Sequence, residues 1–250
     1  DDVSPAVADT DGVGYTANTG GSRTTFDTGY AAVQAAEEIK RLMTKRAAIV
    51  FEVDEDQITF EGGQFMCAST EDKISFKDLA GQLMRTGGPV SCSMSTVSPG
   101  IGPIIAGNLV DVEVDPETGK VDVLRYTAFL DVGTAIHPAY VEGQIQGGTV
   151  QGIGWALNEG YVYDENGAML NSSFLDYRMP TTLDVPMIDT VLIEVPNPRH
   201  PFGVRGVGEA PIIPPLSALA IAVSNAIGVK MNSLPLTPDV VLEALESKGP

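Results

Sequence analysis

Pro201-Phe-Gly-Val-Arg-Gly-Val-Gly-Glu209, followed directly by the apolar run Ala210 to Gly228, is the stretch on which the interpretation of this 250-residue sequence depends. Glycines stand at Gly203, Gly206 and Gly208. Because glycine lacks a Cβ atom, the backbone there can adopt positive φ or pass close to a bulky group. The run from Leu216 to Ile227 is apolar on nearly every face, which predicts a buried helix that ends at Gly228.

One carboxylate, Glu209, stands between these glycines and the predicted helix. The pattern predicts that the turn delivers it to a poorly solvated place at the start of the helix. Burial raises the pKa of a carboxyl group and suits it to general-base catalysis near neutral pH. The alternative is that Glu209 is only an acid of the first helical turn, where the helix dipole favours negative charge.

The composition is that of an acidic globular protein. Hydrophobic residues make up 43% of the chain, and 33 Asp and Glu against 15 Lys and Arg give a net charge of −18. This charge disfavours binding to nucleic acid or to an anionic membrane. The two cysteines, Cys67 and Cys92, form no C-x-x-C pattern. We therefore expect no iron–sulfur cluster or structural zinc in this chain, no membrane partner, and a cytoplasmic location.

A second glycine-rich stretch, Asn18-Thr-Gly-Gly-Ser-Arg-Thr-Thr25, precedes a predicted helix from Tyr30 to about Arg46. The free N–H groups of Gly20, Gly21 and Ser22 and the helix dipole together predict an anion site, to which Arg23 would add a bidentate donor. The alternative is an ordinary glycine loop with a surface arginine. The loop matches neither the Walker sequence nor the Rossmann fingerprint, which argues against ATP and NAD.

A third unusual stretch runs from Asp131 to Leu157 and is predicted to be helical from Pro138, since proline suits a first helical turn. Five glycines follow within this helix, although each costs about 1 kcal/mol relative to alanine. Gln144 and Gln151 lie seven residues apart and so share a face, where their amides could bind a heteroaromatic ligand. The alternative explanation for the glycines is a close helix–helix crossing.

The remaining pattern predicts an α+β fold with mixed, mainly antiparallel sheets and packed helices. Its clearest element is a hairpin of 109–114 and 121–130, joined by the turn Asp115-Pro-Glu-Thr-Gly119. Further strands are expected at 47–53, at 57–60, around Cys67, after Ser91, at 161–163 and at 190–195, and further helices after Ser75 and Thr237. We expect two coupled subdomains, 1–107 and 108–250.

Five stretches together resemble the large subunit of the molybdenum hydroxylases, the family of xanthine dehydrogenase, aldehyde oxidoreductase and their bacterial multi-subunit relatives. In chain order they are Asp9-Thr10; Gly20-Gly21-Ser22-Arg23; Asp131-Val-Gly with Ala135-Ile-His-Pro138, Glu142-Gly-Gln144 and Val150-Gln151-Gly-Ile-Gly154; Tyr177-Arg-Met-Pro180; and Gly206-Val-Gly-Glu209. Their order and approximate spacing are far more specific than any single match. The resemblance identifies residues 1–250 as a C-terminal molybdopterin-binding domain.

The resemblance implies a role for each of these stretches. The loop of Gly20, Gly21 and Ser22 approaches the molybdenum centre through its backbone, Gln144 bonds the pterin, and Glu209 is the catalytic base. The other cofactor-binding residues implied are Arg23, Gln151, Gly206 and Gly208, with Arg23 beside the diphosphate of a cytosine dinucleotide form of the cofactor. No side chain of the chain is implied to ligate the metal directly.

The resemblance also implies partner chains. In the family, the first half of the large subunit supplies a further cofactor loop and most of the substrate pocket, and we expect this sequence to begin after it. The expected partners are therefore that N-terminal half, an iron–sulfur subunit and a flavin subunit with FAD, together with a small-molecule substrate.

The implied activity is that of a xanthine dehydrogenase-like hydroxylase, active only with partner chains, which oxidises a C–H carbon of an N-heterocycle or an aldehyde with water as the oxygen source. Two other classes remain open. One is a non-catalytic structural subunit that retains the fold, and the other is a flavin- or nucleotide-binding module that uses the same glycine loops.

Overall fold

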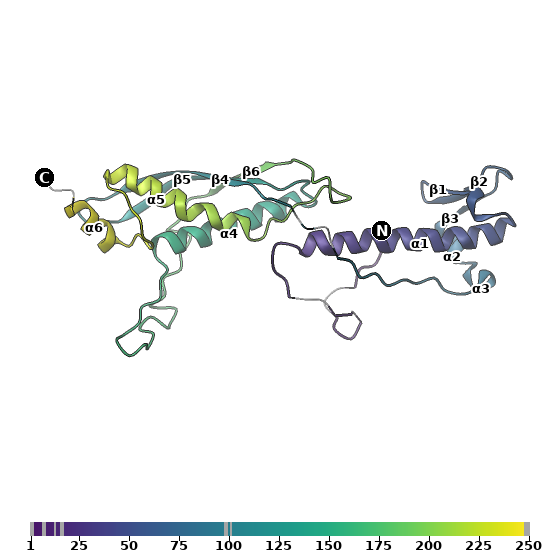
Figure 1. Ribbon diagram of the computed structural model, residues 1–250, viewed down its shortest axis with the longest axis horizontal. Coiled ribbons are helices and arrows are strands. Elements are labelled where there is room, and N and C mark those ends of the chain that lie inside the picture. The colour runs from purple at the N-terminus through teal and green to yellow at the C-terminus, as the bar shows by residue number, and fades with distance from the viewer. Residues whose placement is uncertain are drawn as a thin grey trace.

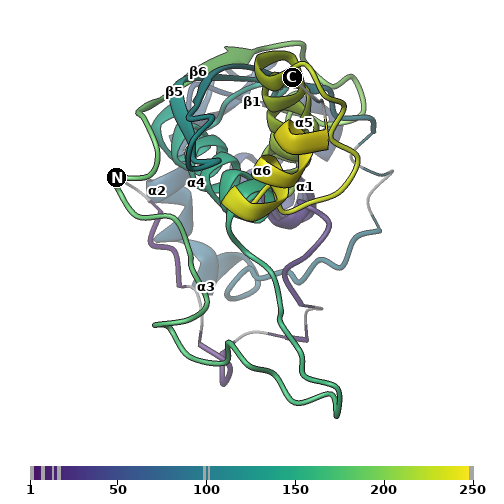
Figure 2. The same cartoon turned by 90° about the vertical axis from the view of Figure 1, so that its left-hand side faces the viewer.

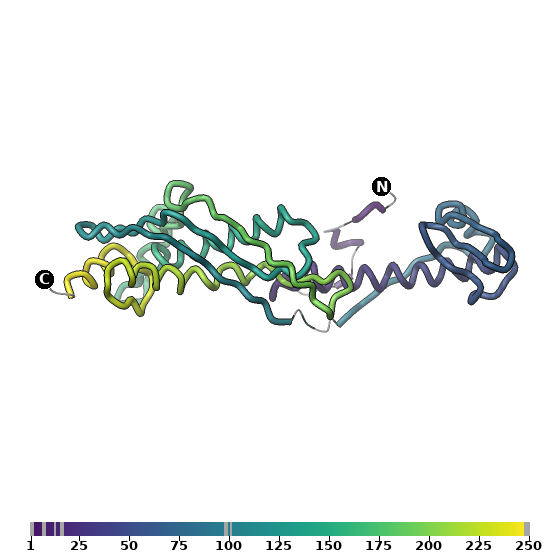
Figure 3. Tube along the Cα trace, turned by 90° about the horizontal axis from the view of Figure 1, so that it is seen from above, coloured from purple at the N-terminus to yellow at the C-terminus, as the bar shows by residue number. Residues whose placement is uncertain are grey.

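The computed structural model describes residues 3–6, 9–12, 14–15, 18–97, 100 and 102–247. The molecule is elongated: a long helix, α1 (Thr24–Phe51), leads from its middle to a small lobe at one end (Figure 1). A larger lobe at the other end holds a second sheet and most of the other helices. Seen from above, the C-terminal end of the chain lies at the far tip of this larger lobe (Figure 3).

The small lobe is a three-stranded antiparallel sheet packed on the second half of α1. Its core is formed by Met43 and Ala47 of α1 with Phe65, Cys67 and Leu79. The elements are η1 (Glu55–Gln57), β1 (Ile58–Glu61), β2 (Gln64–Cys67), β3 (Lys73–Ser75), α2 (Phe76–Ala80) and α3 (Leu83–Thr86), with strand order β1-β2-β3. The sequence predicted β1 and β2 and missed β3, which is only three residues long.

The strand predicted at 47–53 is wrong, because α1 continues through most of this segment. Met43 and Ala47 lie four residues apart and are both buried, so the helical period extends past the predicted end of the helix. Ala47 and Ala48 are strong helix formers and outweigh the β-branched residues after them. The helix ends at Glu52, which has a left-handed backbone with φ of 56° and donates its N–H to Ala48 O.

The larger lobe has two layers, a three-stranded sheet and two helices that cover one of its faces (Figure 2). The sheet has the order β4-β5-β6, with β4 and β5 antiparallel and β5 and β6 parallel. The elements are β4 (Ala106–Val114), β5 (Val121–Asp131), α4 (Pro138–Leu157), β6 (Ile188–Ile193), η2 (Ala210–Ile212), α5 (Ile213–Ile227) and α6 (Pro238–Ser247). The fold class is α+β.

The predicted hairpin of 109–114 and 121–130 is confirmed as β4 and β5. The strand predicted at 190–195 is β6, which begins two residues earlier and lies parallel to β5 after the crossover through α4. The strand predicted after Ser91 is wrong: the segment is extended but runs alone beside α1, where the Cys92 thiol contacts Ala35 O at 3.5 Å.

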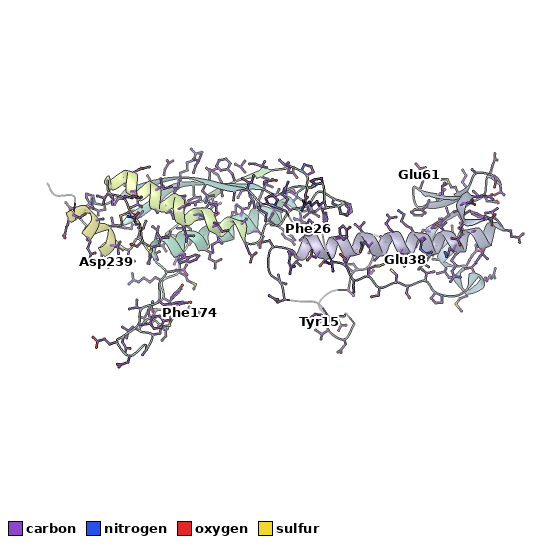
Figure 4. The ribbon with its side chains drawn as sticks, viewed as in Figure 1. Tyr15, Phe26, Glu38, Glu61, Phe174 and Asp239 are labelled. Carbon is purple, nitrogen blue, oxygen red and sulfur yellow. The ribbon has the colours of Figure 1, made fainter. Side chains whose placement is uncertain are left out.

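A loop between α4 and β6 projects from the larger lobe and carries Phe174 partway along it (Figure 4). The strand predicted at 161–163 lies in this loop and is wrong, since only a single bridge from Tyr163 to Met169 forms there. The side chain of Phe174 is 90% exposed. The loop therefore presents apolar surface outside the core.

The helix α5 is buried along one stripe rather than on nearly every face, which corrects the prediction from its composition. Pro215, Leu219, Val223 and Ile227 recur every four residues and face the core, whereas Ile221 is 61% exposed. The turn after the helix is made by Gly228, as predicted, with φ of 70°.

In the described ranges, Ala210–Ile227 is long and apolar enough to cross a membrane by length and composition alone. Core helices of soluble proteins also meet that criterion. Because the buried stripe of α5 packs against α4 and β4, we interpret the segment as a core helix.

The boundary near residue 107 between two subdomains stays a prediction. Two separate hydrophobic cores are present among the described residues, one in the small lobe around Phe65 and one in the larger lobe around Tyr126 and Leu219.

Candidate functional site

Two predicted loops meet where α1 begins, beside the larger lobe (Figure 1). The hydroxyl of Ser22 accepts a hydrogen bond from the backbone N–H of Glu209 at 2.9 Å and donates one to Glu209 Oε2 at 3.2 Å. These residues are 187 positions apart in the sequence. The serine therefore fixes both the backbone and the side chain of Glu209.

The loop before α1 has an unusual backbone. Gly21 and Ser22 have φ values of 67° and 57°, so a serine occupies the left-handed region that normally favours glycine. Such a conformation costs on the order of 1–3 kcal/mol and must be held by the surrounding structure. Arg23 follows as the N-cap of α1, half-exposed, with its Nε 3.9 Å from Asp27 Oδ2.

A third segment, the first half of α4, reaches the same place. A Cβ atom on Gly208 would lie 3.5 Å from Ser22 Oγ and 3.8 Å from Gln144 Oε1. Gly208 thus lies beside both the serine and the glutamine, at ordinary van der Waals distance from each. The structure brings together Ser22, Gln144, Gly208 and Glu209, all of which the sequence singled out.

Glu209 is exposed in this chain, which corrects the prediction of a poorly solvated carboxylate. Glu209 is the N-cap of η2, the short helix that precedes α5, and its side chain makes no capping hydrogen bond. Its Oε1 accepts no hydrogen bond from any residue that the structure describes. The carboxylate is therefore held by one oxygen and open at the other.

The glycines of α4 lie in different surroundings: the close helix crossing is confirmed for two of them, and the approach of a ligand stays a prediction for two that are open. Gly148 and Gly152 face the start of the next helical segment: a Cβ on Gly148 would lie 2.8 Å from Pro211 Cβ, and one on Gly152 would lie 2.7 Å from Pro215 Cβ. These positions make a close helix crossing. Gly143 and Gly147 meet nothing within 4 Å in the described structure.

The open glycines share the exposed side of α4 with the two glutamines. Gln144 and Gln151 are both exposed and are separated by about 10 Å along the helix, from the rise of 1.5 Å per residue. Gly147 lies between them on this side. Gln151 is thus on the same helix face as Gln144, two turns away from the Ser22–Glu209 contact.

Buried His200 also joins α1 to the loop that leads to Glu209, and the sequence analysis missed it. Its Nδ1 accepts the N–H of Phe202 at 3.2 Å, so in the neutral ring Nε2 carries the proton and donates it to Phe26 O at 3.1 Å. Phe26, labelled in Figure 4, lies at the start of α1. Nothing local in the sequence signals this contact, because its partner is 174 residues away.

The donors assembled here suit a flat polar ligand better than a bare metal ion. Among the residues that the structure describes, no group of three or more His, Cys, Asp or Glu could hold a metal. The available groups are backbone N–H groups, amides, a hydroxyl and a glycine face without side chains. This set fits a pterin cofactor, which carries its metal on its own ligands and needs hydrogen bonds and close backbone approach.

Comparison with known proteins assigns the family. A family model described as the molybdopterin cofactor-binding domain matches residues 1–186. The chain belongs to this family. It is a member of the molybdenum hydroxylases, as the resemblance of its five stretches implied. The matched range of this molybdopterin-binding chain includes Ser22 and Gln144 and ends before Glu209.

Individual relatives cover the rest of the chain. It is 33% identical over 234 residues to the gamma subunit of the 6-hydroxypseudooxynicotine dehydrogenase complex of Paenarthrobacter nicotinovorans, a match covering 88% of the chain and 29% of the relative. It is 32% identical over 250 residues to the xanthine dehydrogenase molybdenum-binding subunit of Escherichia coli O157:H7, with 98% and 33% covered.

A solved structure shows the same fold. The crystal structure of a Cu,Mo-CO dehydrogenase in its carbon monoxide reduced state superposes with a TM-score of 0.85 at 28% identity, covering 96% of this chain and 31% of that one. The molybdopterin-binding chain thus spans about a third of the length of the relatives that it matches.

Proposed function

We propose that this chain forms one wall of the molybdenum site of a hydroxylase and presents Glu209 there as the general base. The observation that carries the proposal is the double hydrogen bond of Ser22 with Glu209, next to Gln144. It unites three segments far apart in the sequence around one carboxylate with an open oxygen. A structural subunit without activity would have no need to hold a carboxylate in this way.

Particular residues would hold the cofactor. The backbone of Gly20, Gly21 and Ser22 would face the metal end, and Gln144 would bond the pterin from α4. Gly147 would let the ring system approach the helix backbone, since no described side chain occupies that space. Gln151 lies further along the same face, where it would contact the part of the cofactor distant from the metal.

The turn and the first loop complete the proposed contacts. Gly206 and Gly208 would keep the turn before Glu209 clear of side chains, and buried Gly206 precedes exposed Gly208 in this turn. The exposed guanidinium of Arg23 would pair with the diphosphate of a cytosine dinucleotide form of the cofactor.

The chemistry follows from this placement. When bound, molybdopterin with its molybdenum supplies the two-electron oxidation of a substrate C–H bond with oxygen from water. Glu209 would accept, at Oε1, the proton that the attacking oxygen loses. Ser22 holds Oε2 and the backbone N–H, which leaves Oε1 without a hydrogen bond from the described residues. General-base catalysis of this kind contributes about 10²–10⁴-fold to a rate.

We propose that the substrate is a small N-heterocycle or aldehyde and that further chains complete the enzyme. The relatives include a lettered subunit of a dehydrogenase complex and a molybdenum-binding subunit, which supports partners for this chain. The proposed partners are the N-terminal half of the large subunit, an iron–sulfur subunit and an FAD subunit, assembled in the cytoplasm. Glu209 and the exposed side of α4 would then be covered by the N-terminal half.

The experiment compares Glu209→Gln with Glu117→Gln in the assembled enzyme. Glu117 is an exposed acid in the turn between β4 and β5, which holds none of the site residues. We expect Glu209→Gln to lower kcat by at least about 10²-fold, the general-base contribution, with molybdenum and pterin content unchanged. The control should retain both activity and content.

Three results would contradict the proposal. Turnover of Glu209→Gln within about threefold of the unmodified enzyme, well below a general-base contribution, would place the base elsewhere. Purified enzyme without molybdenum and pterin would favour the structural subunit. Flavin bound by this chain in place of a pterin would favour the flavin-binding module.

A further inference from the structure

A buried ion pair lies just before the turn that carries Glu209. Arg205 Nε is 3.1 Å from Asp131 Oδ2, and the two side chains are only 12% and 11% exposed. The other ion pairs in the described parts of the chain have both partners more exposed, as for Arg125 and Asp189 at 71% and 60%. Removing one partner of a buried pair leaves an uncompensated charge, so such a pair holds its surroundings firmly.

The guanidinium of Arg205 ties the turn to further segments. It donates through Nη1 to Pro103 O at 3.0 Å and through Nε to Val195 O at 3.3 Å. These carbonyls belong to the chain before β4 and to the chain after β6. A planar guanidinium holds its donors in a rigid fork, whereas an ammonium group has three rotatable donors on a flexible stem.

The backbone around the pair is equally constrained. The N–H of Arg205 donates to Val132 O at 3.2 Å, and Asp131 Oδ1 accepts the N–H of Gly133 at 3.1 Å. A Cβ atom on Gly133 would lie 2.9 Å from Arg205 N, so only glycine permits this crossing of the two chain segments. The crossing therefore holds the end of β5 against Arg205, which lies four positions before Glu209.

Beyond this anchor, Gly206 is buried and Val207 packs against the core of the larger lobe, whereas Gly208 and Glu209 are exposed. Within the described structure, the hydrogen bonds of the exposed Glu209 to other segments go to Ser22. An exposed carboxylate on a glycine-rich turn has considerable conformational freedom. Besides the contact with Ser22, the backbone of Glu209 is held from both ends, by Arg205 before the turn and by η2 after it.

We propose that Arg205 and Asp131 are positioning residues for the base: their buried pair holds the turn of 206–209 so that Glu209 reaches its reacting position. This inference rests on the proposed role of Glu209. The inference adds that the catalytic rate depends on the Arg205–Asp131 pair, although neither side chain contacts the Glu209 carboxylate or the loop of 20–22. A misplacement of about 1 Å at a catalytic group can lower a rate by about 10²-fold.

The test uses Arg205→Lys and Asp131→Asn in the assembled, cofactor-loaded enzyme. Lysine keeps the charge and loses the directed bonds to the two carbonyls, whereas asparagine keeps the acceptor for Gly133 and loses the charge. Arg125→Lys is the matched control, since Arg125 lies in the same lobe but its ion pair is exposed. The measurements are kcat, KM, molybdenum content, and hydrogen exchange of peptides covering 206–212.

For Arg205→Lys we expect kcat to fall by about 10–100-fold, as for a small misplacement, with KM and molybdenum content unchanged. Hydrogen exchange should become faster in 206–212, including at the Glu209 amide, which donates its hydrogen bond to Ser22. The control, Arg125→Lys, should change neither kcat nor the hydrogen exchange of 206–212. If Asp131→Asn does not assemble, Arg205→Lys alone provides these measurements.

A double-mutant cycle separates positioning from general loss of structure. If Arg205 acts through the base, adding Arg205→Lys to Glu209→Gln should lower the residual single-turnover rate by less than about threefold, because coupled residues are not additive. Full additivity, or unchanged exchange in 206–212, would overturn the positioning role while Glu209 remained the base. An active Glu209→Gln enzyme would overturn both proposals together.

Discussion

The substitutions Gly147→Ala and Gly152→Ala distinguish the roles of the two faces of α4. Each adds the same methyl group to the same helix, but in different surroundings. At Gly152 the new Cβ atom would lie 2.7 Å from Pro215 Cβ, 2.8 Å from Pro215 Cγ and 2.9 Å from Ile212 O. At Gly147 it would meet nothing within 4 Å in the described structure. Both substitutions therefore gain helix propensity, but only Gly152→Ala also incurs a steric penalty.

The magnitudes predict opposite changes in stability. Gly→Ala within a helix gains about 1 kcal/mol, whereas overpacking a filled core costs about 1–3 kcal/mol. The contacts at Gly152 involve a proline ring and a backbone carbonyl, which cannot rotate away. We expect Gly152→Ala to destabilise by about 1 kcal/mol net, or about 2–4 °C in melting temperature for a chain of this size. Gly147→Ala should stabilise the cofactor-free protein by a similar amount.

Cofactor content should change in the reverse order. If the open face of α4 receives the pterin, the methyl group of Gly147→Ala occupies the approach and should lower the molybdenum content of the purified enzyme. Gly152→Ala faces away from the ligand and should retain molybdenum in the molecules that fold. The assay measures molybdenum by mass spectrometry and thermal unfolding of the cofactor-free complex. A Gly147→Ala enzyme with full molybdenum content would refute the assignment of this face.

Further predictions concern single contacts of the site and the projecting loop. Ser22→Ala removes both hydrogen bonds to Glu209, so kcat should fall by about 10–100-fold, since one bond to a charged group contributes about 1.5–3 kcal/mol. Ser22→Gly also lacks the hydroxyl but favours the left-handed backbone, so it should be impaired to the same degree, and full activity of either variant would contradict the contact. Arg23→Gln should lower the content of dinucleotide cofactor, measured by nucleotide release, without lowering the melting temperature; an unchanged content would remove Arg23 from the site. The hydrogen bond that Tyr177 donates to Glu159 raises the pKa of Tyr177 to about 12, so it favours the folded state below the unfolded pKa of about 10 and is lost as the pH rises towards 12. Glu159→Gln should therefore shift one tyrosine titration to lower pH in ultraviolet difference spectra, and an unshifted titration would show that the bond does not form in solution.

The sequence alone was sufficient for features that depend on local chemistry. Pro138 marks the start of α4, Gly228 ends α5 in a left-handed conformation, and the turn after β4 joins a hairpin as predicted. Propensity, proline geometry and turn residues act over a few positions, so they can be recognised without knowledge of the fold. The same holds for the glycine-rich stretches that directed attention to Gly20–Arg23 and to Glu209.

Local patterns failed where packing decided between alternatives. The β-branched residues at 47–53 favoured a strand, but burial of Met43 and Ala47 against the small sheet continues α1 through them. The parallel pairing of β6 with β5 likewise depends on the crossover through α4. At 47–53 the free energy of a contact with a distant segment outweighed the preference of the segment itself. For β6, which the sequence predicted as a strand, the distant segment decided only the direction of its pairing.

The site shows the same division. The sequence identified Ser22, Gln144 and Glu209 as separate candidates, but only the tertiary structure joins the serine to the glutamate across 187 residues and leaves that glutamate exposed in this chain. The sequence also offered two explanations for the glycines of α4, and the structure assigns Gly152 to helix packing and Gly147 to the open face. Solvation and contact between distant residues are properties of the packed chain, and no local pattern contains them.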